Sequence, residues 1–273
     1  MRTHTLLVAA TVLALTATLH AQVQSDSTDS SPWRFALQGE YWYGHISGYT
    51  QTPAGGQPGT SSSHRPTFGE MGIHDTSVYD VGFNAAWHNE EVQIAGQFIR
   101  PSGSDTLSSD LESHGKFFAA GTQVSSDVQL DWYRLAYRHR FDIPQWNLTL
   151  RPSVGAAFWA FDYHLSGGGA SASRSYIKVA PQAGIDAEWR PGNGPFSIDL
   201  NLIGSLPITP PLPQIHVEEL TGGYRLVHKG KLDVSARAGV AFEQIRYEDD
   251  QTLPNHIKAD LGPMIVVGFE VDF

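Results

Sequence analysis

The sequence predicts a single all-β domain, an antiparallel up-and-down barrel of about ten strands. From Trp33 to Phe273, apolar and polar residues alternate with a period of two rather than 3.6, which is typical of strands. The connections between the alternating segments are short and long in turn. Charged residues make up only 17% of the chain, which contains 27 Gly and no Cys. This composition excludes a disordered acidic protein, a coiled coil and a disulfide scaffold.

The N-terminus has the three parts of a cleaved signal peptide over residues 1–21. Arg2 supplies the positive end, Leu6–Leu19 is apolar apart from threonines, and Ala21 is a small residue at the expected cleavage site. An N-terminal membrane anchor is the alternative, which the short apolar core disfavours. Residues 22–32 are rich in Ser, Asp and Thr and predict a polar periplasmic lead-in, so the barrel is expected over residues 33–273.

Ten segments carry the strand pattern, and the last is the clearest. There Ile257, Ala259 and Leu261 begin an apolar row that runs to Phe273, while Lys258 and Asp260 begin the opposite, largely polar row. The predicted strands are 33–45, 77–88, 91–100, 124–141, 147–164, 175–190, 196–206, 217–228, 231–247 and 257–273.

The expected connections fall into two classes. Short turns are predicted at 89–90, 142–146, 191–195 and 229–230. Longer loops, rich in Gly, Ser, Pro and Asp, are predicted at 46–76, 101–123, 165–174, 207–216 and 248–256.

Alternation alone does not decide whether the apolar face points inward, as in a soluble barrel, or outward to lipid. Short turns at one end only, strands of ten or more residues, and polar faces with an intermediate charge content favour lipid. Aromatic residues on the apolar face also gather at strand ends, as at the two membrane–water interfaces. They are Phe35, Trp87, Phe141, Trp189 and Phe196 near the short turns, and Tyr43, Tyr79, Phe98 and Tyr133 toward the long loops.

The signal peptide, the strands and a C-terminal strand that ends on the aromatic Phe273 resemble bacterial outer-membrane β-barrel proteins as a class. The resemblance implies a bacterial outer-membrane location, membrane lipid as a partner and both termini in the periplasm. It also implies that Gly268–Phe273 is read by the barrel-insertion machinery.

The inward face is predicted to be lined by charged residues of both signs in nearly equal numbers. Because unpaired charges in a confined space are costly, ion pairs across the lumen are expected. A ring of ten strands is also narrow, so we expect a plugged lumen, with a narrow solute path as the alternative. The predicted lining residues are Glu40, Asp80, Arg134, Arg138, Arg151, Lys178, Asp186, Glu188, Asp199, Arg225, Asp233, Arg237, Lys258 and Asp260.

One short motif could support catalysis. His164-Leu165-Ser166 resembles the His-x-Ser pair of outer-membrane phospholipases and lipid A deacylases, in which the His makes the Ser a nucleophile toward an acyl ester. The third member of those sites is absent at the downstream spacing, where Lys178 stands instead. The alternative is a loop-edge His beside a solvated Ser. Asp162 with His164 also resembles half of the site of omptin proteases, but the chain has no Asp-x-Asp for the other half.

Other chemistry finds no support in the sequence. No His pair has metal-ligand spacing and no Gly-rich phosphate loop occurs, so no metal or cofactor is expected. The net charge of −10, with acidic residues spread along the chain, argues against nucleic acid. The loop at Ile46–Thr76 could carry recognition of an unknown surface ligand. The sequence thus favours a non-enzymatic barrel for envelope structure or surface binding, with a small-solute channel and a His164/Ser166 acyl hydrolase as alternatives.

Overall fold

The computed structural model describes residues 33–52, 65–192, 194–207, 212–251 and 254–273. The predicted signal peptide and lead-in lie outside these residues and stay predictions. Ten long strands form the wall: β1 (Trp33–Gln51), β2 (Asp75–Trp87), β3 (Glu90–Ile99), β7 (Gln123–His139), β9 (Leu148–Gly167), β10 (Ala170–Trp189), β11 (Phe196–Ser205), β12 (Gln214–Lys229), β13 (Leu232–Glu248) and β14 (His256–Asp272). Shorter elements are β4 (Ser102–Thr106), β5 (Leu111–Ser113), β6 (Lys116–Phe118), β8 (Phe141–Ile143) and the 3₁₀ helix η1 (Pro144–Trp146). Within the described residues, no helix is long and apolar enough to cross a membrane.

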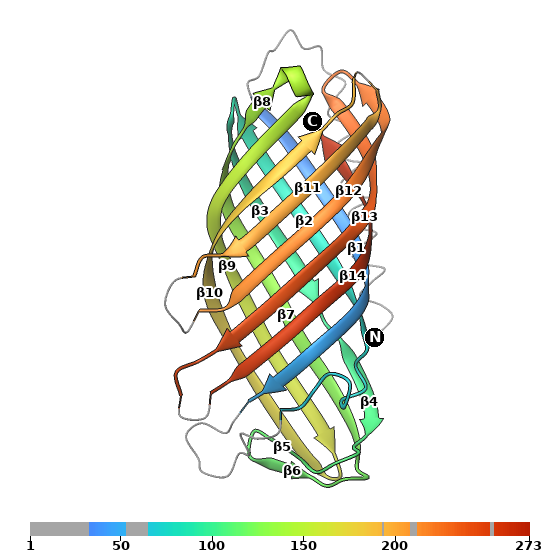
Figure 1. The fold of residues 1–273 in the computed structure, drawn as a ribbon, viewed down its shortest axis with the longest axis vertical. Coiled ribbons are helices and arrows are strands. Elements are labelled where there is room, and N and C mark those ends of the chain that lie inside the picture. Colours follow the sequence, from blue (N-terminus) through green and yellow to red (C-terminus); the bar gives the residue numbers. More distant parts are fainter. Residues whose placement is uncertain (1–32, 53–64, 193, 208–211, 252–253) are drawn as a thin grey trace. The chain divides into compact units, whose positions relative to one another are not determined.

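The ten strands close into an antiparallel barrel, as predicted (Figure 1). Each strand pairs with its neighbours in the order β1-β2-β3-β7-β9-β10-β11-β12-β13-β14, and β14 returns to β1. The first and last strands are tied by reciprocal 2.9 Å backbone hydrogen bonds between Phe35 and Phe273. Closure leaves no unpaired sheet edge around the middle of the wall, which is what a strand in lipid requires.

One predicted loop is wrong. Residues 165–174 were expected to form a long connection, but β9 and β10 continue to Gly167 and Ala170 and are joined by a two-residue turn. Gly168 and Gly169 both have positive φ, at 57° and 82°. Glycine adopts this left-handed conformation without steric cost, and the tight hairpin turn needs it twice. β1 likewise continues to Gln51, into the expected 46–76 loop.

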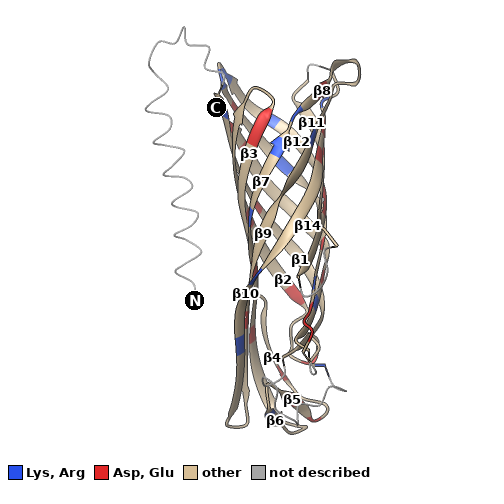
Figure 2. Ribbon diagram, turned by 90° about the vertical axis from the view of Figure 1, so that its left-hand side faces the viewer, with Lys and Arg blue, Asp and Glu red and all other residues tan. Residues whose placement is uncertain are grey.

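The outward face carries a continuous apolar belt. The barrel has a short-turn end, where the short turns join the strands, and a long-loop end, where the longer connections lie. Aromatic rings border the belt on its margins toward both ends. Most of the wall seen in Figure 2 is free of Lys, Arg, Asp and Glu. Exposed belt residues include Phe83, Ile94, Leu135, Val154, Ile185, Ile198, Leu200, Leu220, Val240, Ile265 and Val267, with Trp87, Phe141, Trp189, Phe196 and Tyr224 on one border and Tyr43, Tyr79 and Tyr133 on the other.

An apolar belt of this extent, left open to the surroundings, is stable only against lipid, since monomeric soluble proteins rarely expose large contiguous apolar surfaces. The chain is therefore a transmembrane β-barrel of the outer-membrane type.

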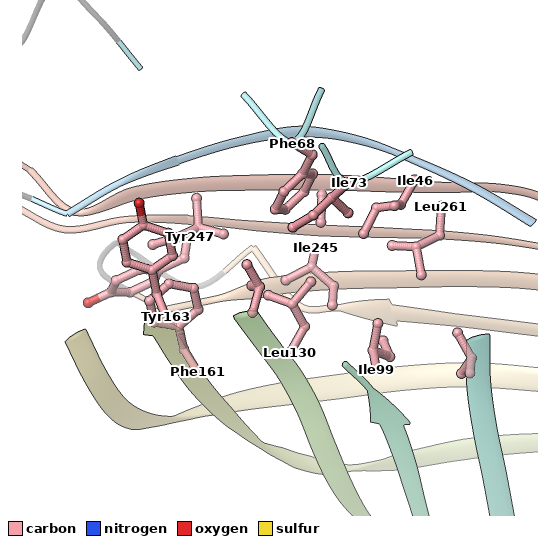
Figure 3. Packing of buried hydrophobic residues seen from close by; sticks show 14 of the residues in the cluster. Ile46, Phe68, Ile73, Ile99, Leu130, Phe161, Tyr163, Ile245, Tyr247 and Leu261 are labelled. Atoms are coloured by element: carbon pink, nitrogen blue, oxygen red, sulfur yellow. The ribbon is translucent and has the colours of Figure 1, made fainter. Parts of the chain in front are cut away.

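The interior is divided into two halves of different character. Toward the short-turn end it is filled by charged and amide side chains. Toward the long-loop end it holds a hydrophobic core that the alternation pattern had not predicted. Phe68, Met71 and Ile73, from the connection between β1 and β2, enter this core. Figure 3 shows Phe68 and Ile73 directed toward Ile245 and Leu130.

Candidate functional site: the closed lumen

The strand pleat turns ten of the fourteen predicted lining residues toward the lumen. These residues alternate with exposed belt residues along their strands and are buried or half-buried. They are Glu40, Asp80, Arg134, Arg138, Arg151, Lys178, Asp186, Glu188, Asp199 and Arg237. Arg225 and Asp233 lie near the short-turn end, where their side chains are 3.9 Å apart.

The expectation fails for Lys258 and Asp260, which lie on the outward side of β14. Ile257, Ala259 and Leu261 are buried in the core instead. The alternation is reset because Gly262 and Pro263 form a β-bulge. The register of β14 shifts by one residue at this point against both β1 and β13. An extra residue in a strand exchanges the faces of everything that precedes it.

Arg237 is the centre of one ion-pair network. Its guanidinium lies 3.2 Å from Glu40, 2.7 Å from Glu270 and 3.7 Å from Glu219. It also donates a 2.8 Å hydrogen bond to Thr221. The Arg237 residue is 9% exposed, so its positive charge offsets part of the negative charge of these three carboxylates in a space with little bulk water.

A second network links β3, β7, β9 and β10. Arg151 donates to Asp186 at 2.5 Å and to Glu188 at 2.6 Å. Arg138 lies 3.3 Å from Glu91 and 3.7 Å from Asp186, so Asp186 joins the two arginines. The two networks border a polar cavity of about 100 Å³.

Next to these networks, a cross-lumen layer of three side chains closes the barrel. The indole Nε1 of Trp132 on β7 donates to Glu243 on β13 at 2.9 Å and to Gln97 on β3 at 3.0 Å. β7 and β13 are five strands apart in either direction around the ring, so the bond to Glu243 spans the lumen. The three residues are 2%, 3% and 0% exposed. At this level the lumen contains side chains rather than a channel.

An aromatic layer of Trp159, Phe161, Tyr176 and Tyr247 lies beyond the cross-lumen layer toward the long-loop end. The rings of Trp159 on β9 and Tyr247 on β13 are 5.6 Å apart, and those of Tyr176 and Tyr247 are 5.4 Å apart. The Lys178 ammonium lies 5.4 Å from the Tyr247 ring centre, within the range of a cation–π interaction. The lumen is thus blocked a second time.

Sequence reasoning missed the residues that close the lumen. The strand pattern places Trp132, Trp159 and Tyr247 at inward positions. That alternation was the signal in the sequence that could have identified them as lumen residues. Their partners across the barrel are far away in sequence: Trp132 and Glu243 are separated by 111 residues.

His164 and Ser166 both face outward on β9, beyond the belt. Their paired neighbours are polar: Asp127 and Ser173 flank His164, and Ser125 and Ser171 flank Ser166. Asp127 therefore stands beside His164 where a third member of a catalytic set could lie. In the described part of the chain, however, no hydrogen bond joins His164 to Ser166 or to Asp127. An acyl hydrolase at this position stays an alternative.

We expect the purified protein to hydrolyse short acyl esters no faster than its Ser166→Ala variant. The reason is that Ser166 has no base hydrogen-bonded to it, and an unactivated hydroxyl is a weak nucleophile. Release of nitrophenol from p-nitrophenyl butyrate measures the rate, with Ser171→Ala on the neighbouring strand as the matched control. Hydrolysis that Ser166→Ala abolishes and Ser171→Ala keeps would establish the hydrolase.

Within the described ranges, no group of three or more His, Asp or Glu side chains is placed to hold a metal ion.

Comparison with known proteins gives similarity in fold only. No family model matches the chain, and no curated protein matches it. Among solved structures, the outer membrane protease OmpT from Escherichia coli is 10% identical, with a TM-score of 0.44 over 92% of this chain and 99% of that one. Ail, the attachment invasion locus protein of Yersinia pestis, is 13% identical, with a TM-score of 0.35 over 88% of this chain and 99% of that one. The translocator domain of the autotransporter NalP from Neisseria meningitidis is 12% identical, with a TM-score of 0.39 over 96% of each chain.

Proposed function

We propose that this outer-membrane barrel is non-conducting and non-enzymatic, and that it holds a rigid platform for surface binding above the membrane. We place the short-turn end, where β1 begins at Trp33 and the chain ends after β14, in the periplasm, so the long-loop end is extracellular. The observation that carries the proposal is the buried bond between Trp132 and Glu243, which joins opposite walls of the lumen.

The extracellular part supports a binding role. β9 and β10 have 20 residues each, about twice the 9–11 that a tilted strand needs to span the hydrocarbon layer. The excess length stands beyond the belt around a hydrophobic core of its own. Hydrogen bonds fix the connections to this core: Ser126 donates to the Met71 carbonyl at 2.9 Å, and Ser113 lies 3.1 Å from the Tyr163 hydroxyl. Rigid scaffolds of this kind commonly present recognition surfaces on their loops.

We also propose that the barrel-insertion machinery is a partner and binds the chain through Gly268–Phe273. These residues belong to the strand that closes the barrel against β1.

We expect the wild-type protein to give no discrete current steps in a planar lipid bilayer, because two layers of side chains block the lumen. A variant with Trp132→Ala, Trp159→Ala and Tyr247→Ala should give steps, since it removes three of the five large rings in the two layers. Single-channel recording measures both, with insertion verified by protease protection.

The matched control replaces three lipid-facing aromatic residues, Tyr41→Ala, Tyr79→Ala and Phe158→Ala, and should stay silent. Reproducible steps from the wild-type barrel would overturn the proposal and favour the small-solute channel instead.

A further inference from the structure

The β-bulge at Gly262–Pro263 changes the outer surface of the barrel as well as its interior. Opposite this pair, each neighbouring strand has one residue, His45 on β1 and Phe242 on β13. Without the extra residue Lys258 would point into the apolar core. With it, Lys258 stands on the outward face, where its ammonium lies 2.6 Å from Asp260.

Lys258 belongs to a cationic patch formed with Arg246 and Arg65. Lys258 has two direct cross-strand partners, Arg246 on β13 and Tyr49 on β1. Arg65 donates to the Tyr49 hydroxyl at 3.1 Å, and its guanidinium lies 5.0 Å from the ring centre. The patch therefore spans three adjacent strands.

The patch is asymmetric around the barrel. Along the described wall strands, Arg246 and Lys258 are the outward-facing cations beyond the belt. The outward carboxylates near them are Asp260, Glu218 and Glu248, and Glu248 lies 3.8 Å from His256. Arg100, just after β3, is held by the buried carboxylate of Asp131 at 2.7 Å. Across β7, β9 and β10, the outward residues beyond the belt include Asp127, Asp162 and several serines.

A groove of about 910 Å³ lies beside the patch and crosses six strands from β10 to β1. Ile185, Leu202 and Phe242, which belong to the belt, line its membrane side. Gln244 and Asp260 line the other side, and Asp260 accepts a 2.6 Å hydrogen bond from Gln244. Gly204 and Gly262 are also among its lining residues. The groove is thus apolar toward the membrane and polar toward the cationic patch.

We propose that this groove and patch bind a phosphorylated lipid of the outer leaflet. Its acyl chains lie against Leu202 and Phe242, and its phosphate is bound by Arg246 and Lys258. Long basic side chains extend along an interface while their charged ends stay in the headgroup layer, and charge-assisted bonds to phosphate are strong. The proposal rests on the membrane location and is independent of whether the lumen conducts.

The test measures lipid binding by the full chain purified from membranes in dodecyl maltoside. Dihexanoyl phosphatidic acid is titrated by calorimetry against the wild type and against the double variant Arg246→Gln/Lys258→Gln. We expect the double variant to bind about thirtyfold more weakly, because two interfacial cations are lost. The control Lys229→Gln/Lys231→Gln removes the same charge at the short-turn end and should bind within about twofold of the wild type.

Three outcomes would overturn the proposal. Equal weakening in both double variants would mean general electrostatic attraction. Equal affinity for dihexanoyl phosphatidylcholine, whose phosphate is a diester neutralised by choline, would mean that the net negative charge of the phosphate is not selected. Displacement of the lipid by equimolar inorganic phosphate would mean a free-anion site. The conservative variant Arg246→Lys/Lys258→Arg keeps both charges and should retain binding, which separates loss of charge from loss of fold.

Discussion

Replacement of Arg237 by methionine is expected to destabilise the folded barrel by about 3–5 kcal/mol. The side chain is buried, and its guanidinium holds Glu40, Glu219 and Glu270 within 3.7 Å. Methionine fills a similar volume, so the loss comes from the carboxylates that are left without a counter-charge in a space with little water. Removing one partner of a buried network costs far more than removing an exposed ion pair.

Urea unfolding of the protein in detergent micelles, followed by tryptophan fluorescence, measures this loss. The matched control is Arg246→Met, the same substitution at an exposed outward position, and should change stability by less than about 1 kcal/mol. A similar, small effect at both positions would show that the Arg237 network does not hold the barrel interior together.

Deletion of Gly262 is expected to abolish the folded barrel. Without the extra residue, β14 would have to turn Lys258 and Asp260 into the hydrophobic core and expose Ile257 and Leu261. Burying two polar groups in place of two apolar ones costs several kcal/mol, which approaches the whole stability of a typical domain.

Two measurements report the folded barrel: the difference in gel mobility between unheated and heated samples, and the far-ultraviolet circular dichroism spectrum. Deletion of Gln251, in the turn before β14, removes one residue without changing the register of the strand and should fold. Pro263→Ala keeps the residue count and should also fold. A Gly262 deletion that folds with wild-type stability would show that the bulge does not set the faces of β14.

The bulge also explains why the sequence pattern assigned Lys258 and Asp260 to the wrong face of β14. Assigning odd-numbered residues to one face of a strand and even-numbered residues to the other is correct as long as each residue advances the strand by one step. An inserted residue is not visible in the pattern, because the odd-numbered row of β14 is apolar on both sides of Gly262: Ile257 and Leu261 are buried in the core, and Ile265 belongs to the exposed belt. Only the register against β1 and β13 shows that Lys258 and Asp260 face outward. The same limitation hid the cationic patch.

Turn geometry was a second limit. The composition of the run at 167–169 predicts part of a loop because Gly and Ser dominate it, although the same glycines permit a two-residue hairpin turn. Serines at 171, 173 and 175 alternate outward on β10, in solvent rather than lipid, so the apolar row that identified the other strands is missing there.

The sequence by itself determined the all-β class, the ten strands and the outward apolar belt, because a period of two is a local property that each strand carries alone. Only the tertiary structure decided what fills the lumen. The bond between Trp132 and Glu243 depends on which strands lie opposite each other, and that follows from closure of β1 against β14. The hydrophobic core beyond it depends in the same way on a connection, around Phe68, that enters the barrel. Contacts between opposite walls leave no periodic trace in the chain, since each partner is placed by all the strands between them.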